Sequence, residues 1–323
     1  MFAPEESLAF LRNSLDKRKD KDEDLKILAE RLGHLPLALE LASRYLNGHP
    51  RLSINEYLVQ AREAFEHPSM RDWRKDLPAP TQHDLDLQRT FALSWEALKD
   101  ENAQKIFQTA GYLAPNTPIP PEIFEKALEI SSEICDEVLS TLYGLGLLRQ
   151  SENEQPTIHP LLAEYARGIN QISVNSDLIE KLSDQLSILA RKANDQVDQT
   201  GSLQWFAPLR SHILSTVDFA DKAEIEDAAN LLGNLGYYLQ KIADYSGART
   251  AFERALKIHE AAFGPDHPNV AIRVNNLGLV LKDLGDLSGA RTAYERALKI
   301  FKQFLPADHP SIKIVQGNLD SLK

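Results

Sequence analysis

The sequence predicts a mainly α-helical chain that ends in a right-handed α-solenoid of repeated helix pairs. Apolar residues recur at three- and four-residue spacing through most of the 323 residues. Only two short segments, LLRQS and TIHP, favour strands. Near the C-terminus the sequence repeats itself with a period of 42 residues, so that Asn234, Asn276 and Asn318 occupy one place in successive units.

Charge and composition restrict the partners of this chain. The formal net charge is −11, which disfavours nucleic acid and anionic membranes because phosphate contacts need clustered Lys and Arg. The single cysteine, Cys135, cannot form an internal disulfide and suits a reducing compartment. We find no signal peptide and no apolar run long enough to span a membrane. We therefore expect a cytoplasmic protein with no nucleic acid and no membrane partner.

The N-terminal part, residues 1–68, predicts a small helical subdomain. Its clearest helix begins at Pro36 in the stretch LGHLPLALELA. A proline at the first helical position removes no hydrogen bond, since that N–H has no partner within the helix. The stretch 69–83, rich in Pro and charge, predicts a linker.

Residues 84–170 predict three helices, a short β-hairpin and a closing helix, which is the order of elements in a winged-helix domain with a small β-wing. A winged helix suggests DNA binding, but this segment holds six Lys and Arg against fourteen Asp and Glu. The helix that would enter the major groove, EICDEVLSTLYGLG, holds neither Lys nor Arg. Because even non-specific DNA affinity needs several phosphate contacts, we favour a role in packing against protein.

Residues 171–226 predict a helical connector, and residues 227–323 predict two full helix-pair repeats and part of a third. Gly285 is expected to end a helix in the left-handed conformation and Ser288 to cap the next one. Pro268 and Pro310 are expected in the first turn of a helix. The residues expected to face one another inside the second repeat are Leu277, Gly278, Leu281 and Leu284 on its first helix and Ala290, Tyr294, Ala297 and Leu298 on its second.

The first helices of the repeats predict a groove for an extended protein or peptide segment. Amide side chains can pair with both the N–H and the C=O of a peptide backbone, which holds a peptide with little sequence preference. The recurring asparagines would form a ladder along this groove. Alternatively they bond across neighbouring helices, and the sequence leaves both interpretations open. The candidate groove residues are Asn234, Tyr237, Gln240, Lys241, Asn275, Asn276, Leu279, Lys282 and Asn318.

The motifs that would indicate an enzyme are absent. The sequence contains no GxxxxGK[ST] phosphate-binding loop and no hydrophobic strand ending in paired acidic residues. It also contains no GxSxG, and one cysteine with scattered histidines gives no zinc site of standard spacing. We therefore expect no catalytic residues, no metal and no cofactor in this chain alone.

Three stretches and their order resemble the NB-ARC proteins, which belong to the STAND class of signal-transduction ATPases. LKILAERLGHLPLALELASRYL resembles the helical subdomain that follows their nucleotide-binding core, while RTFALSWEAL and IHPLLAEYAR resemble the beginning and end of their winged helix. The 42-residue units resemble tetratricopeptide repeats of the kinesin light chain type. The resemblance covers nearly the whole chain and implies the C-terminal part of a bacterial STAND protein, without effector or NTPase core.

This resemblance implies a switch that ADP holds closed. In the family a proline of a GLPLAL-like motif packs on adenine, and a histidine of an MHD-like motif touches the β-phosphate. Pro36 and His159 hold these places, with His34 for the usual glycine and with Ile158 and Pro160 for the usual Met and Asp. Each of the two is also explained as a residue that begins a helix. ADP or ATP is expected only when the chain is joined to a nucleotide-binding core, in cis or in trans.

Three hypotheses about function follow. The first is a non-enzymatic regulatory and sensor region of a STAND NTPase, in which repeats bind a protein or peptide and the winged helix gates the switch. The second is a free-standing tetratricopeptide adaptor, and the third a winged-helix transcription regulator. The sequence does not identify the ligand, the effector, the oligomeric state or any bound nucleotide, nor whether the chain is a fragment.

Overall fold

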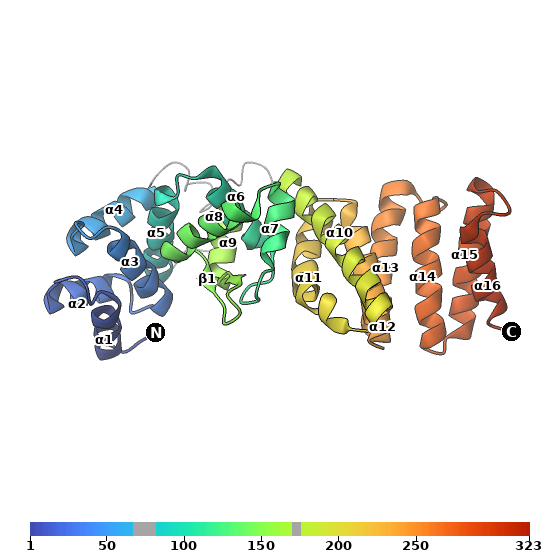
Figure 1. Ribbon diagram of the computed structural model, residues 1–323, viewed down its shortest axis with the longest axis horizontal. Helices are drawn as coiled ribbons and strands as arrows, with labels where there is room; N and C mark the ends of the chain where they lie inside the picture. Colours follow the sequence, from blue (N-terminus) through green and yellow to red (C-terminus); the bar gives the residue numbers. More distant parts are fainter. Residues whose placement is uncertain (67–81, 170–175) are drawn as a thin grey trace. The chain divides into compact units, whose positions relative to one another are not determined.

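The computed structural model describes residues 1–66, 82–169 and 176–323. These residues are almost entirely helical, with one two-stranded sheet (Figure 1), which confirms the predicted mainly α fold. The chain divides into two compact units, Met1–Asn175 and Ser176–Lys323. The predicted linker at 69–83 lies outside the described residues, except for its last two positions, where helix α5 begins.

The first unit begins with four helices around an apolar core. They are α1 (Pro4–Ser14), α2 (Asp22–Arg31), α3 (Pro36–Gly48) and α4 (Ile54–Glu66). Leu11, Leu28, Leu41 and Tyr57 are fully buried among them. Helix α3 is buried on most of its surface, because its sequence PLALELA places apolar residues on more than one face.

The rest of the first unit contains the sheet. Its elements are α5 (Gln82–Ala97), α6 (Glu101–Tyr112), α7 (Pro121–Leu128), α8 (Ser132–Gly144), β1 (Arg149–Gln150), β2 (Pro156–Thr157) and α9 (Pro160–Gly168). The strands pair antiparallel with Arg149 opposite Thr157, and α6 packs against α7, α8 and α9. Helix α5 packs against both α3 and α9, so the two halves of this unit share one helix. Four helices, α5 to α8, precede the hairpin where the sequence predicts three, and one helix, α9, follows it as expected.

The second unit is a row of helices. They are α10 (Ser176–Thr200), the 3-10 turn η2 (Leu203–Trp205), α11 (Ala207–Lys222), α12 (Asp227–Lys241), α13 (Tyr245–Phe263), α14 (Pro268–Asp283), α15 (Leu287–Phe304) and α16 (Pro310–Asp320). Helices α10 and α11 pack against α12, and α12 to α16 pack in succession (Figure 1). The segment predicted as a connector, 171–226, thus contributes a helix pair to the unit that holds the repeats.

Within each repeat a glycine allows the two helices to approach closely. A Cβ on Gly236 would lie 2.7 Å from the ring of Phe252, and a Cβ on Gly278 would lie 2.6 Å from the ring of Tyr294. The inward residues predicted on the second helix, among them Tyr294, are buried. Leu284, which we expected to face inward, is instead 44% exposed because it lies after the last turn of α14. The helix-to-helix spacing is thus fixed by a glycine against an aromatic ring.

The helix ends confirm most of the expected caps and correct one. Gly285 has a φ of 83°, as predicted for a left-handed residue. The cap of α15 is Asp286 and not Ser288: the Asp286 carboxylate accepts from the Gly289 N–H at 2.9 Å. Ser288 donates its hydroxyl to that same carboxylate. Pro268 begins α14, as expected.

Candidate functional site

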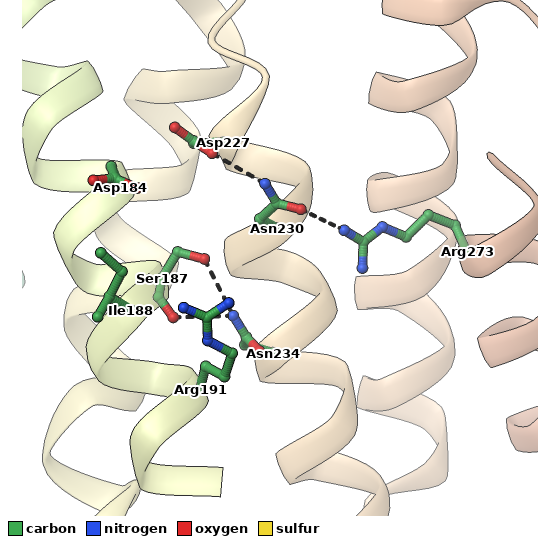
Figure 2. A pocket seen from close by; sticks show the side chains of 8 residues that line it. All are labelled: Asp184, Ser187, Ile188, Arg191, Asp227, Asn230, Asn234 and Arg273. Carbon is green, nitrogen blue, oxygen red and sulfur yellow. Dashed lines mark hydrogen bonds between the residues drawn. The ribbon is translucent and has the colours of Figure 1, made fainter. Parts of the chain in front are cut away.

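A hollow of about 270 Å³ lies where the helices α10, α12 and α14 meet, within the second unit (Figure 2). All three are first helices of successive helix pairs. The sequence predicts a groove on α12 and α14, whereas α10 lies in the predicted connector. Both acidic and basic side chains line the hollow, together with amides. The lining residues are Asp184, Ser187, Ile188 and Arg191 from α10, Asp227, Asn230 and Asn234 from α12, and Arg273 from α14.

Arg273 is the most unusual residue of this pocket. Its Nη2 donates to Oδ1 of Asn230 at 2.6 Å, and Nδ2 of Asn230 donates to Asp227 at 3.0 Å (Figure 2). The carboxylate of Asp227 therefore fixes the amide with its oxygen toward the guanidinium. The Nε of Arg273 is buried and has no hydrogen-bond partner. Among the described residues neither Arg273 nor Arg191 forms an ion pair, so both guanidinium charges are uncompensated by a carboxylate in contact.

Helix α12 has a glycine at the position where the guanidinium of Arg273 packs against it. A Cβ on Gly233 would overlap Nη1 of Arg273, so only glycine leaves the room that the side chain occupies. Burial lowers the pKa of Arg273 to about 10, which still leaves it charged at neutral pH. Placing a charge in a protein interior without an opposite charge lowers the stability of the fold by several kcal/mol, as an order of magnitude.

His259 of α13 lies close enough to Arg273 for the guanidinium charge to act on its imidazole ring. It is 2% exposed, and both of its ring nitrogens are buried without a hydrogen-bond partner. Burial first, and then the charge of Arg273, lower the pKa of His259 to about 4, so the ring is neutral at pH 7. Phe263 meets the His259 ring edge-on at 5.5 Å. A neutral imidazole and a charged guanidinium thus share one buried junction between α12, α13 and α14.

Four of the predicted groove residues are engaged in contacts within α12 or with its neighbours. Asn234 donates to the backbone and hydroxyl oxygens of Ser187, at 3.2 Å in each case. Tyr237 donates to Asp198 at 2.6 Å, and Lys241 pairs with the same carboxylate at 2.8 Å. Separately, Gln240 donates to Asp283 of α14 at 2.6 Å.

The predicted groove residues of α14 and α16 also bond to each other. Asn318 donates to Asn275 at 3.0 Å, and Lys282 donates to Ser321 at 2.8 Å. The structure places Asn275 differently from the prediction: it is buried, because α16 covers it, and not at an open groove surface. Asn276 lies beside Asn275 and accepts a weak bond from it at 3.5 Å.

Leu279 is partly buried and packs against the core of the second repeat. Asn234 and Asn318 each form a hydrogen bond to the neighbouring first helix. This is the alternative interpretation of the recurring asparagines, in which they bond across helices and not to a peptide. Their binding role stays a prediction.

Sequence reasoning found only one residue of the pocket, Asn234. It missed Arg273 and Asn230, although the sequence carries a signal for them. Leu231, Arg273 and Val315 are spaced 42 residues apart, so they occupy the same position in α12, α14 and α16. Arg273 is the charged residue among these three, and the other two are apolar. The same register makes His259 the counterpart of Phe301.

In the first unit, the residues carried over by resemblance lie at two helix starts. Pro36 is exposed at the first position of α3. Just before it, Gly33 and His34 have φ values of 60° and 54°. Glycine adopts this conformation most readily, so the backbone explains why a glycine would suit position 34. Here His34 holds it with a hydrogen bond of 2.9 Å between its Nδ1 and the hydroxyl of Ser7.

A group of charged side chains joins α3 to the sheet and to α8. Glu40, one turn beyond Pro36, pairs with Arg149 of β1 and with Arg44 of its own helix. Arg44 also donates to the backbone oxygen of Tyr143 at 2.6 Å. His159 lies within electrostatic range of both Glu40 and Arg149. The start of α9 therefore lies near Glu40, which is one turn from Pro36 in α3.

His159 is the N-cap of α9. Its Nδ1 accepts from the Leu161 N–H at 3.2 Å, in the same way that His267 and His309 cap α14 and α16. Burial, and then the charge of Arg149, lower the pKa of His159. In the neutral ring with Nδ1 as acceptor, the proton is on Nε2, which can donate to an oxygen.

Among the residues that the structure describes, no group of three or more His, Cys, Asp and Glu is placed to hold a metal ion. None of the helices in the ranges that the structure describes is both long and apolar enough to cross a bilayer.

One segment of the chain is similar to a known family. Residues 227–303 match the tetratricopeptide repeat family. Among solved structures the chain is similar to a Signal Transduction ATPase with Numerous Domains (STAND) protein with a tetratricopeptide repeat sensor from Pyrococcus horikoshii. The identity is 12% and the TM-score 0.36, over 99% of this chain and 56% of that one.

The chain thus spans little more than half of that protein's length, and a likeness of this degree carries no conclusion about activity. No curated protein sequence matches the chain. What the comparisons establish is that residues 227–303 are similar to tetratricopeptide repeats.

Proposed function

We propose that this chain is the regulatory and sensor region of a STAND-type signalling protein, without catalytic activity of its own. Its second unit would bind a protein or peptide, and its first unit would contribute to a nucleotide-held switch. The observation that carries the proposal is the pocket lined by α12 and α14, which lie in the segment that matches the tetratricopeptide repeats, and by α10, which precedes that segment. Repeats of this kind generally mediate contacts between proteins, through the concave surface that stacked repeats create.

The binding half of this proposal can be tested with peptides. Ile272 of α14 is 45% exposed and has the same place in its helix as Asn230, which lines the pocket. We expect Ile272→Lys to weaken binding of the full chain to a degenerate pool of immobilised heptapeptides at least tenfold. Leu287→Lys is the matched control, since Leu287 is 53% exposed but lies at the start of the second helix α15. Equal binding by both variants, or no binding by the unmodified chain, would refute a peptide groove on this face.

The switch half of the proposal is supported by the arrangement at Pro36 and His159. The Nε2–H of His159 has the chemistry to donate to a phosphate oxygen, and most phosphate contacts would come from a nucleotide-binding core outside this chain. The residue also belongs to a charged group that joins α3 to β1, so a ligand there would contact elements from both halves of the first unit.

The test separates the capping role of His159 from a phosphate contact. Asparagine caps helices well, so His159→Asn keeps the cap of α9 and removes the Nε2–H. We expect this variant, joined to a nucleotide-binding core, to release ADP at least tenfold faster, while His267→Asn, the same change at the start of α14, does not. Unchanged release would remove the sensor role of His159.

A tetratricopeptide adaptor without any nucleotide is the second candidate. It is favoured by one observation: the N-cap bond of His159 is the same as those of His267 and His309 within the repeats, where no nucleotide is expected. If His159→Asn has no effect on ADP but Ile272→Lys abolishes peptide binding, the adaptor is the better description.

A further inference from the structure

The first helix pair of the second unit, α10 and α11, lies outside the segment that matches the tetratricopeptide repeats, which begins at residue 227. Its turn nevertheless has the register of the repeats. Gly201, Ala243 and Gly285 are spaced 42 residues apart, and each follows the first helix of its pair with a positive φ, of 71°, 60° and 83°. Because a positive φ is uncommon in a protein chain, its recurrence at this spacing indicates a common turn in all three pairs.

The core of this pair follows the same register. One position on the first helices and one on the second helices are 0% exposed in all three pairs. Each position therefore faces the interior in α10 and α11 as it does in the repeats. The residues are Leu186, Ala228 and Val270 on the first helices, and Ile213, Ala255 and Ala297 on the second helices.

An ion pair between second helices is also repeated. Arg254 of α13 pairs with Asp218 of α11 at 3.0 Å, and Arg296 of α15 pairs with Glu260 of α13 at 2.6 Å. The two arginines are 42 residues apart, and so are the two acidic residues. Helix α11 is thus related to α13 as α13 is related to α15.

This pair lacks the glycine and the aromatic ring that bring the helices of the other pairs together. Asn194 has the place of the packing glycine, and the exposed Arg210 has the place of the aromatic ring. Asn194 instead donates to the backbone oxygen of Asn234 in α12 at 3.0 Å. The pair therefore has the turn and the core of a repeat without its most recognisable side chains.

The groove face of α10 continues that of the other first helices. Ile188 of α10 lines the pocket and has the register of Asn230, Ile272 and Ile314. Ile272 and Ile314 are 45% and 60% exposed. We propose that α10 and α11 form a divergent tetratricopeptide repeat, so that the binding surface extends over four first helices: α10, α12, α14 and α16. The binding half of this inference rests on the proposed function.

The additional helix determines the length of the partner. A helix with its side chains has a diameter of about 10 Å, and an extended chain rises about 3.3 Å per residue. Three first helices therefore correspond to about nine residues of an extended segment, and four to about twelve. The partner that fits this surface is an extended segment of about twelve residues.

Two pools of immobilised peptides, nine and twelve residues long and made of uncharged residues, measure this extension. We expect the full chain to bind the twelve-residue pool at least tenfold more tightly than the nine-residue pool. Ile188→Lys should lose this gain and still bind the shorter pool. Leu214→Lys is the control and should keep the gain, since Leu214 is 42% exposed but lies on the second helix α11.

Hydrogen exchange in increasing denaturant tests the repeat without a peptide. In a solenoid each repeat is stabilised by its neighbours. Leu186→Ala, which shortens a buried side chain of α10, should therefore lower the denaturant midpoint of α12 and α13 together with that of α10 and α11. Leu214→Ala, at an exposed position, should lower neither.

The outcomes separate this inference from the proposed function. Equal binding of the two pools, or a gain that survives in Ile188→Lys, would overturn the extension of the surface but not the proposed function. No binding of either pool would overturn the proposed function and the binding half together. A midpoint that falls in α10 and α11 alone would overturn the repeat itself and make this pair a connector.

Discussion

The two junctions between successive repeats have the same backbone register but different chemistry. Between α12 and α14 the two positions that differ hold the buried His259 and the partly buried Arg273. Between α14 and α16 the corresponding positions hold Phe301 and Val315, which are both buried. The first junction has a polar pocket beside it, while the second belongs to a continuous apolar cluster. The comparison teaches that the 42-residue register determines how successive helices stack. It does not determine which side chains occupy the groove-facing positions of each junction, and these can vary with function.

The largest effect is expected when the first junction is converted into the second. The double variant His259→Phe/Arg273→Val replaces an unpaired buried charge with apolar side chains of the other junction. We expect its free energy of unfolding to rise by about 1–4 kcal/mol, as for other buried charges replaced by apolar groups. Chemical denaturation measures this result. A destabilised double variant would mean that His259 and Arg273 are needed for packing, and the comparison would then fail.

The packing glycines should respond alike in both repeats. In Gly236→Ala and Gly278→Ala the new Cβ would be forced against the buried rings of Phe252 and Tyr294, so each should lose about 1–3 kcal/mol, the usual cost of overpacking. Gly317→Ala is the control, because a Cβ there meets no atom within 4 Å. It should gain about 0.5–1 kcal/mol, since alanine is the better helix former. A large difference between Gly236→Ala and Gly278→Ala in denaturation would show that the two repeats are not packed equivalently.

Acid should destabilise the first junction and not the second. The folded-state pKa of His259 is lowered to about 4, below the unfolded value near 6.5, so its contribution is complete above pH 6.5 and is lost as the pH falls toward 4. The groups that act on it are Arg273, His267 and Asp227, together with the backbone of Asn269.

The loss over that window should be on the order of 2 kcal/mol, measured as the pH dependence of unfolding. His259→Phe should remove this component, while the acid sensitivity due to Asp198, whose pKa Lys241 and Tyr237 lower, should remain. An unchanged pH profile in His259→Phe would show that the imidazole is not buried in solution.

Much of the stacking could be predicted from the sequence, because it depends on short-range patterns. Pro268 at the start of α14 and Gly285 after its end follow from backbone chemistry that a single residue decides. The groove could be predicted only in part. The register places Gln240 and Lys282 on a helix face, but their partners Asp283 and Ser321 lie on the next helix and depend on side-chain conformation. Arg273 was missed because an amphipathic pattern with one charged residue on its inner face still predicts a helix.

The smallest change in stability is expected when Gly233 gains a side chain. In Gly233→Ala the new methyl group occupies the place of Nη1 of Arg273, which is the far end of a flexible side chain and can swing away. The gain in helix propensity, about 0.5–1 kcal/mol, offsets the loss of the Asn230 bond, which has a similar magnitude for hydrogen bonds in proteins. We expect the free energy of unfolding, measured by chemical denaturation, to change by less than about 0.5 kcal/mol. A loss of about 1–3 kcal/mol, the usual cost of overpacking, would show that the guanidinium cannot leave its place beside Gly233.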